Sequence, residues 1–274
     1  MEVILAEYLG FCYGVKRAIR LARDSAESKN ASTLGPIIHN PQMVARLAEE
    51  GVGSVDSIDE VPDGGTIIIR SHGVGPAVYE KAEKRPIRLV DATCPHVKKA
   101  QKAAYRLAQD GYSVVIIGEK QHPEVKSILE WAGGHATVVE TEEEADALSP
   151  FVKLGIVAQT TCSGAKFQSV AARLIAKSND VRILRTICTA TDQRQSAALA
   201  LAAEVDMMLV IGGKNSANTT RLAQLCAEKT VVHHIETASE LEDEWFHNIK
   251  KIGITAGAST PDWIIREVYQ KCQM

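Results

Sequence analysis

Short apolar runs alternate with segments of helical periodicity along the whole chain, and this alternation limits the possible folds more than any other feature. Each run is only a few residues long, which suits a buried strand better than a helix. Strands that alternate with helices pair in parallel, so the pattern predicts an α/β fold with parallel sheets. The predicted strands are Val3–Ala6, Thr66–Ile69, Ile87–Val90, Val114–Ile117, Leu154–Ala158, Met207–Ile211 and Ile252–Thr255. The predicted helices begin near Val15, Gln42, Pro76, Val97, Glu124, Ala165, Asp192, Thr219 and Asp262.

Charge and composition exclude several classes of protein. The 274 residues include 31 basic and 34 acidic side chains. The net charge of −3 does not show the excess of basic residues that is typical of nucleic-acid-binding proteins. No apolar run approaches the roughly 20 residues of a membrane helix. Glu2 and Glu7 flank a short apolar run at the N-terminus, which is no signal peptide. We therefore expect a cytoplasmic monomer whose six cysteines serve metal binding, catalysis or burial rather than disulfides.

One cysteine occupies an unusual place. The segment "VDATCPHVKK", residues 90 to 99, ends a predicted strand and starts a predicted helix. Pro95 suits the first helical position, where its missing N–H has no partner anyway. Cys94 then takes the N-cap, where Ser, Thr, Asp or Asn is usual. The positive end of the helix dipole stabilises a thiolate at this place, which favours a metal ligand.

The same arrangement occurs three times along the chain. Cys12, Cys94 and Cys188 each stand just ahead of a helix, in "GFCYGV", "ATCPHV" and "TICTAT". We interpret the repetition as three α/β units that each present one cysteine to a shared centre. The predicted domains are a strand segment at 1–13, followed by 14–94, 95–188, and 189–274 with the C-terminal tail.

Three distant cysteines predict a particular kind of metal centre. They include no C-x-x-C pair, which argues against a zinc finger or ribbon. On a cubane iron–sulfur cluster, three thiolates leave the fourth iron without a protein ligand, whereas electron-transfer clusters normally use four. Such an open iron can act as a Lewis acid on a substrate oxygen. Cys162, Cys226 and Cys272 lack the position of the repeat, and we interpret them as bystanders.

Histidines and hydroxyl residues follow other predicted strands. Three histidines lie in strand-to-helix turns, in "IIHNP", "RSHGVGP" and "EKQHPEV", and further polar residues stand at helix N-termini in "KNSANT" and "AGASTPD". The loops after parallel strands converge on one crevice, where ligands bind. Hydroxyls, amides and helix N-termini are groups that bind phosphate. The predicted anion-binding residues are His39, His72, His122, Ser216, Asn218 and Ser259.

Glu124 is the one carboxylate among these turns. At a helix start it could serve only to complement the helix dipole. Because it stands two residues after His122, it could equally deliver a proton to a bound ligand, with Thr160 as a relay. The sequence alone leaves both interpretations open.

The motifs together resemble the 4-hydroxy-3-methylbut-2-enyl diphosphate reductases, the last enzymes of the methylerythritol phosphate route to isoprenoids. The resemblance covers essentially the whole chain and depends on the order of "GFCYGV", "IIHNP", "SHGV", "DATCP", "HPEV", "QTT", "GGKNSANT" and "TAGASTPDW". It implies a trefoil of three pseudo-symmetric α/β domains around one [4Fe–4S] cluster. The implied cluster ligands are Cys12, Cys94 and Cys188, and the substrate hydroxyl would bind the open iron.

The resemblance also implies a reaction and a set of contacts. The substrate loses its hydroxyl by taking up two electrons and two protons, which gives isopentenyl and dimethylallyl diphosphates. Glu124 would supply protons with Thr160 nearby, and ferredoxin, flavodoxin or a similar carrier would supply electrons one at a time. The implied contacts of the diphosphate are those of His39, His72, His122, Ser216, Asn218 and Ser259.

At one position the chain departs from the family pattern. The family usually has Lys-Asn-Ser-Ser-Asn where this chain has Lys-Asn-Ser-Ala-Asn, so Ala217 offers no hydroxyl. Either its backbone N–H makes that substrate contact, or the diphosphate binds more weakly. Two other functions remain as alternatives: a three-cysteine trefoil enzyme of the quinolinate synthase kind, and a non-catalytic iron–sulfur redox sensor.

Overall fold

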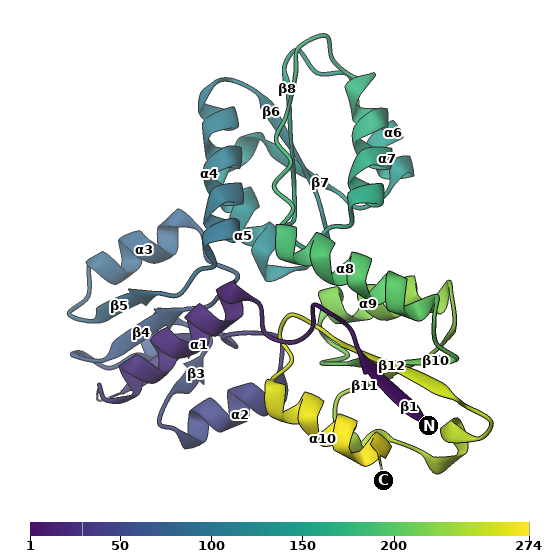
Figure 1. The fold of residues 1–274 in the computed structure, drawn as a ribbon. Coiled ribbons are helices and arrows are strands. Elements are labelled where there is room, and N and C mark those ends of the chain that lie inside the picture. The colour runs from purple at the N-terminus through teal and green to yellow at the C-terminus, as the bar shows by residue number, and fades with distance from the viewer. Residues whose placement is uncertain (29, 274) are drawn as a thin grey trace. The chain divides into compact units, whose positions relative to one another are not determined.

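The computed structural model describes residues 1–28 and 30–273 and confirms the predicted α/β class (Figure 1). Its described strands form three four-stranded sheets, in which neighbouring strands are parallel. All seven predicted strands overlap observed ones. The described part of the chain holds no helix that is both long and apolar enough to span a membrane.

The three sheets have the following strands. The first sheet has the order β3-β2-β4-β5, with β2 (Ala31–Leu34), β3 (Gly53–Val55), β4 (Thr66–Ile69) and β5 (Arg88–Asp91). The second has the order β7-β6-β8-β9, with β6 (Ser113–Ile117), β7 (Ala136–Val139), β8 (Leu154–Ala158) and β9 (Val181–Ile183). The third has the order β11-β10-β12-β1, with β1 (Glu2–Leu5), β10 (Met207–Ile211), β11 (Val231–Ile235) and β12 (Lys251–Ala256).

One strand order is shared by all three sheets. In each sheet, two inner strands lie between two edge strands. One edge strand follows the first inner strand in sequence, and the other edge strand leads to a cysteine. The cysteine-bearing edge strands are β5, β9 and β1, which precede Cys94, Cys188 and Cys12. The third sheet therefore takes this strand from the opposite end of the chain. This common order is the structural form of the internal repetition seen in the sequence.

The nine predicted helices begin within three residues of their predicted starts. The observed helices are α1 (Tyr13–Ala26), α2 (Pro41–Glu49), α3 (Pro76–Glu83), α4 (Pro95–Gln109), α5 (Pro123–Trp131), α6 (Glu142–Asp146), α7 (Gly164–Ile175), α8 (Thr189–Ala202), α9 (Ala217–Ala227) and α10 (Asp262–Gln273). Short 3-10 turns are η1 (Ile58–Glu60), η2 (Gly133–His135), η3 (Ala238–Glu240) and η4 (Asp243–Phe246). The short α6 was not among the predicted helices.

The chain divides into two compact units. The C-terminal unit comprises Met1–Lys16, Ile38–Arg46 and Thr189–Met274, and it contains the third sheet. The central unit comprises Arg17–Ile37 and Leu47–Cys188, and it contains the first and second sheets. The domain boundaries proposed from the sequence after residues 13 and 94 stay predictions, as does the boundary after 188, where the two units also divide.

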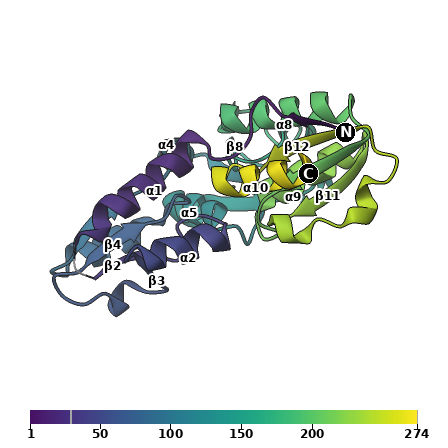
Figure 2. The ribbon, with the colours of Figure 1, turned by 60° about the horizontal axis from the view of Figure 1, so that its bottom comes forward.

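Both faces of the third sheet are buried. Alternate residues of β10 point to opposite sides, so Leu209 packs in one cluster with α10, and Met208 packs in another with α8 and α9. The helices α8 and α10 thus lie on opposite sides of the sheet (Figure 2). Burial on both faces explains why β10 is a continuous apolar run rather than an alternating one.

The second sheet is covered in the same way. Val115 and Ile117 pack against α7, whereas Val114 and Ile116 pack against α4 and α5. The helices α4 and α7 accordingly lie on opposite sides of this sheet (Figure 1). Each such aliphatic side chain contributes about 1.5–3 kcal/mol when it is fully buried. This packing fixes the direction of α4 and α5, whose N-termini carry Cys94 and Glu124.

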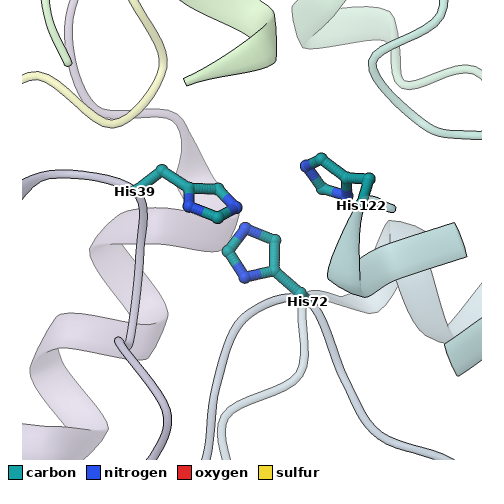
Figure 3. Close-up of side chains that lie close together, drawn as sticks. All are labelled: His39, His72 and His122. Carbon is teal, nitrogen blue, oxygen red and sulfur yellow. The ribbon is translucent and has the colours of Figure 1, made fainter. Parts of the chain in front are cut away.

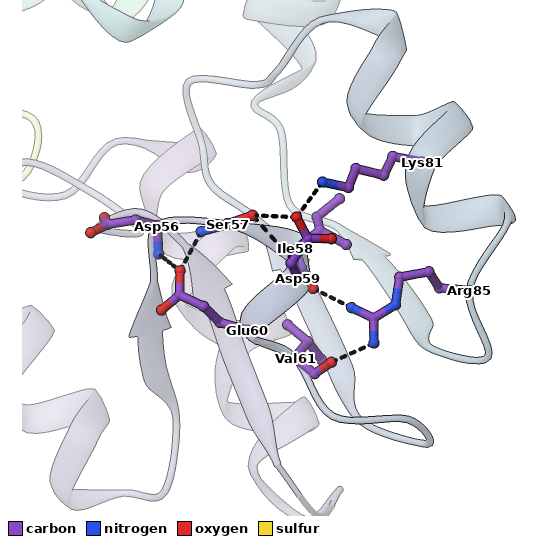
Figure 4. Close-up of polar contacts among 8 residues, drawn as sticks. All are labelled: Asp56, Ser57, Ile58, Asp59, Glu60, Val61, Lys81 and Arg85. Carbon is purple, nitrogen blue, oxygen red and sulfur yellow. Dashed lines mark hydrogen bonds and ion pairs between the residues drawn. The ribbon is translucent and has the colours of Figure 1, made fainter.

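A capped turn anchors the edge of the first sheet. Ser57 caps η1, and the Glu60 carboxylate accepts a hydrogen bond from the Ser57 backbone N–H at 2.7 Å (Figure 4). The Arg85 guanidinium, just beyond α3, donates to the carbonyl oxygens of Ile58 and Val61 at 2.6 and 2.8 Å. These bonds hold η1, which follows the edge strand β3, beside α3.

Candidate functional site

The three repeated cysteines stand where the sequence places them. Cys12 precedes α1 and Cys188 precedes α8, and Cys94 is the N-cap of α4 with Pro95 as the first helical residue. The Cys94 side chain makes no capping hydrogen bond. All three cysteine residues are partly exposed to solvent.

The other cysteines differ from these in burial. Cys162, Cys226 and Cys272 are buried. Burial raises the pKa of both the Cys226 and the Cys272 thiol to about 11. A thiol with such a pKa stays protonated near neutral pH and is a poor metal ligand. The three cysteines outside the repeat are thus the buried ones, and the assignment of Cys12, Cys94 and Cys188 as metal ligands stays a prediction.

The backbone holds each accessible cysteine in the same way. The cysteine N–H donates to a carbonyl oxygen in the loop after the third strand of its sheet, with N–O distances of 2.9 Å for Cys94–Ser71, 2.9 Å for Cys188–Thr160 and 3.2 Å for Cys12–Ala258. Each acceptor lies two residues beyond the end of β4, β8 or β12. These loops carry His72, Thr160 and Ser259. The thiols and the predicted ligand-binding residues are therefore held by shared loops within each unit.

Glu124 is buried rather than exposed at the start of α5. Its side chain is 2% exposed, and its two carboxylate oxygens accept hydrogen bonds from the Thr160 backbone N–H at 2.6 Å and the Thr160 hydroxyl at 2.8 Å. Burial raises the pKa of Glu124 to about 7, against the opposing effect of the two bonds from Thr160. A carboxyl group with this pKa is a proton donor near neutral pH.

His122 is the N-cap of α5. Its ring Nδ1 accepts a hydrogen bond from the Glu124 backbone N–H at 3.1 Å, in place of the usual side-chain oxygen. In the neutral imidazole the proton then resides on Nε2, which is a hydrogen-bond donor. The sequence "HPEV" thus combines a cap, a first-position proline and the buried acid in one helix start.

His72 and His122 form a pair in the central unit (Figure 3). Their ring centroids are 5.3 Å apart and the rings meet edge to face at 84°. Ser127 joins the two elements, because its hydroxyl lies 3.1 Å from the His72 carbonyl oxygen and 2.8 Å from that of Glu124. The sequence reasoning missed Ser127, although its position three residues after Glu124 places it on the same helix face.

In the C-terminal unit, His39 lies against two loops. Its carbonyl oxygen accepts a hydrogen bond from the Ser259 hydroxyl at 3.2 Å. A Cβ atom at Gly213 would lie 3.1 Å from the same oxygen, so only glycine allows this approach without a shift. The preceding Gly212 has a φ of +144°, which also favours glycine. The two glycines of "GGKNSANT" therefore bring the start of α9 close to His39.

The start of α9 offers donors. Ser216 is its N-cap, and the Ser216 oxygen accepts from the Thr219 backbone N–H and from the Thr219 hydroxyl at 3.1 Å. Since Ser216 accepts both bonds, its own hydroxyl proton can be donated to a ligand. Ala217 is the first helical residue and Asn218 the second, and both are half-buried. Such a helix start suits an anion.

The predicted site residues are divided between the two units. The central unit holds Cys94, Cys188, His72, His122, Glu124 and Thr160. The C-terminal unit holds Cys12, His39, Ser216, Ala217, Asn218 and Ser259. Within the units, the structure brings together Glu124 with Thr160, His72 with His122, and His39 with Ser259.

Known proteins resemble this chain over its whole length. The model of a family described as "LytB protein" matches residues 3–273. A 4-hydroxy-3-methylbut-2-enyl diphosphate reductase of Citrifermentans bemidjiense is 50% identical over 273 residues, which cover 99% of this chain and 96% of that protein. The protein of the same name from Geobacter sulfurreducens is 50% identical over 275 residues, covering 100% and 97% of the two chains.

Two solved structures are similar as well. One is (E)-4-hydroxy-3-methyl-but-2-enyl diphosphate reductase, described as the terminal enzyme of the non-mevalonate pathway. It is 46% identical with a TM-score of 0.75 and covers 100% of this chain and 99% of its own. The other is the E-1-hydroxy-2-methyl-but-2-enyl-4-diphosphate reductase from Plasmodium falciparum, which is 28% identical with a TM-score of 0.93, covering 98% and 87%.

Proposed function

We propose that this chain, which belongs to the LytB protein family, is a 4-hydroxy-3-methylbut-2-enyl diphosphate reductase. Its substrate gains two electrons and two protons and loses the hydroxyl oxygen as water, to give isopentenyl and dimethylallyl diphosphates. The names of the relatives at 50% identity support this activity. The observation that carries the proposal is the buried contact between Glu124 of α5 and Thr160, whose carbonyl oxygen also accepts the N–H of Cys188.

The donor set fits a [4Fe–4S] cluster with three thiolate ligands. Cys12, Cys94 and Cys188 are the accessible cysteines, and each precedes a helix whose N-terminal dipole favours the thiolate. When bound, such a cluster supplies electrons and a Lewis-acidic iron that is free of protein ligands. Zinc sites of the finger type, by contrast, use closely spaced cysteine pairs.

The chain's own residues would bind the diphosphate at the far end of the substrate. His122 offers its Nε2 proton, Ser216 its hydroxyl proton, and the start of α9 its backbone N–H groups. His39, His72, Asn218 and Ser259 complete the proposed set. Binding energy from the diphosphate orients the allyl group, whose reacting carbon is distant from the charge.

Glu124 would hold the proton that lets hydroxide leave as water. Hydroxide is a poor leaving group, so a proton donor matched to neutral pH accelerates this step. The Thr160 hydroxyl, 2.8 Å from the Glu124 carboxyl, can accept the proton from Glu124 and pass its own onward. A redox sensor would have no use for this pair, and neither the sensor nor a quinolinate synthase-like enzyme is supported by the relatives.

Turnover with a reduced dye tests the proposed activity directly. The anaerobically reconstituted protein is incubated with (E)-4-hydroxy-3-methylbut-2-enyl diphosphate and reduced methyl viologen, and dye oxidation is followed together with the products. We expect two dye molecules oxidised for each diphosphate product formed. Protein with a full complement of iron that oxidises no dye in the presence of substrate would contradict the proposal.

Ala217 tests how the diphosphate is held. We propose that its backbone N–H, at the first position of α9, meets the phosphate, so that a side-chain hydroxyl adds little. Ala217→Ser should therefore change KM less than about threefold, or under roughly 0.7 kcal/mol. Ala227→Ser, at the exposed opposite end of the same helix, is the matched control. A tenfold fall in KM for Ala217→Ser alone would show that the missing hydroxyl matters.

A further inference from the structure

A basic groove opens beside α4 in the central unit. It has a volume of about 690 Å³. Half of its described lining residues are basic and none of them is acidic, although the whole chain has a net charge of −3. The basic residues are Arg17, Lys98, Lys99, Lys102, Arg106 and Arg185.

The basic side chains form a stripe along one face of α4. Lys99, Lys102 and Arg106 are spaced by three and four residues, which places them on the same side of the helix, and all three are exposed. Like charges at these spacings repel each other and destabilise a helix. The stripe therefore works against the stability of α4, and an external negative charge would relieve that repulsion.

An apolar strip lies within the basic lining. Ile183 and Leu184, at the end of the edge strand β9, are 41% and 40% exposed and both line the groove. An apolar centre with a charged rim is the arrangement found in protein–protein interfaces. Nucleic acid binds through phosphate contacts and has no such need of exposed aliphatic side chains.

The groove lies at the loops that carry two of the accessible thiols. The groove is lined by Thr93 and Pro95, which flank Cys94. It is also lined by Arg185 and Thr186, which lie two to three residues before Cys188. A protein that filled the groove would thus contact the chain directly beside two of the proposed cluster ligands. Electron transfer slows steeply with distance, so this is a favourable place for a donor.

We propose that this groove docks an acidic one-electron carrier protein of the ferredoxin or flavodoxin type. The inference rests on the proposed function and adds the surface that the donor uses. Two reduced carriers bind in succession and each gives up one electron, so that two oxidised carriers are released for each hydroxyl lost as water. Complementary charge would raise the rate of encounter by about 10- to 1,000-fold at low salt.

Two double variants compare charge reversal inside the groove with the same change elsewhere on the surface. Lys99→Glu with Lys102→Glu reverses two charges of the stripe. Lys84→Glu with Arg88→Glu makes the same change of charge at exposed positions of the central unit outside the groove lining. Each holoenzyme is tested for its Kd toward oxidised flavodoxin by calorimetry at low and high salt, and for turnover with reduced flavodoxin and with a reduced dye.

We expect the groove variant to bind flavodoxin at least tenfold more weakly at low salt, with a correspondingly weaker salt dependence. Its kcat/KM for reduced flavodoxin should fall by a similar factor, while its turnover with dye stays within twofold. The control variant should match the native protein in every measurement. Native-like flavodoxin binding by the groove variant, or tighter binding of an RNA oligonucleotide than of flavodoxin by the native protein, would overturn the proposal. The Kd measurement needs no turnover, so it decides the groove separately from the reductase activity.

Discussion

Replacing Glu124 by glutamine is expected to lower kcat at least about a hundredfold. The amide keeps the shape of the carboxyl group and can still accept the bond from the Thr160 N–H, but it has no proton to give. General acid catalysis contributes about 10²- to 10⁴-fold, which sets the size of the loss. Because binding depends on the distant diphosphate, KM should change far less than kcat.

The matched control lies on the same helix. Glu130 is exposed near the end of α5, so Glu130→Gln changes an identical group without touching Thr160. We expect its kcat to stay within a few-fold of the native value. Equal iron content must be verified in both variants. If Glu124→Gln with full iron turned over within a few-fold of the native enzyme, the carboxyl would be merely a structural part of the α5 start.

The pKa of about 7 gives this prediction a dependence on pH. In the proposed mechanism the protonated carboxyl is the active form, so kcat should fall about tenfold for each pH unit above 7. The folded pKa is also raised above the ordinary value of 4.5, so the associated stability is fully present below pH 4.5 and is lost as the pH rises through 7. Glu124→Gln should remove this loss and gain up to about 3 kcal/mol at pH 8, measurable by urea unfolding.

Cys94→Ser should raise the stability of the apoprotein and lower its iron content. The Cys94 thiol caps no N–H of α4, whereas serine is a favoured N-cap residue and would add about 0.5–1 kcal/mol to the stability of the apoprotein. The hydroxyl is nevertheless a poor iron ligand, so iron content after anaerobic reconstitution should fall from about four atoms per chain to a small fraction of that. A more stable protein that has lost its iron is the expected result.

The same loss of iron is expected for Cys12→Ser and Cys188→Ser. Cys226→Ala is the control, because this thiol is buried in the apolar core and alanine leaves no polar group there. It should retain its iron, measured by absorbance near 400 nm and by metal analysis. Retention of iron by all three serine variants would refute the proposed ligand set.

Some of the fold could be predicted because its signal is local. The strands Thr66–Ile69, Leu154–Ala158 and Met207–Ile211 are inner strands, buried on both faces, and the predicted ranges equal the observed ones. The missed β3, β7, β9 and β11 are edge strands, which pair on one side only and carry exposed or polar residues. The inner strand β2, "ASTL", was missed because small and polar residues give no apolar run.

In the candidate site, too, features that depend on sequence neighbours could be predicted, whereas features that depend on distant residues could not. The N-cap role of Cys94 depends on its neighbours in sequence and could be predicted. The burial of Glu124 depends on Thr160, 36 residues away, so the sequence could not decide between a surface carboxylate and an acid with a raised pKa. Ser127 was missed for a similar reason, since its partner His72 comes from another strand-to-helix loop.

The pairing of β1 with β12 determines when the third sheet can form during synthesis of the chain. A ribosome makes β1 about 250 residues before β12, yet the two strands pair in the third sheet. The central unit can fold on emerging, since domains generally fold as units while the chain is being made. The Cys12 N–H, however, must wait for the carbonyl of Ala258. Loading of iron on the proposed ligand set is therefore expected only after β12 has been made, and a product that stops before β12 would lack the backbone support of one proposed ligand.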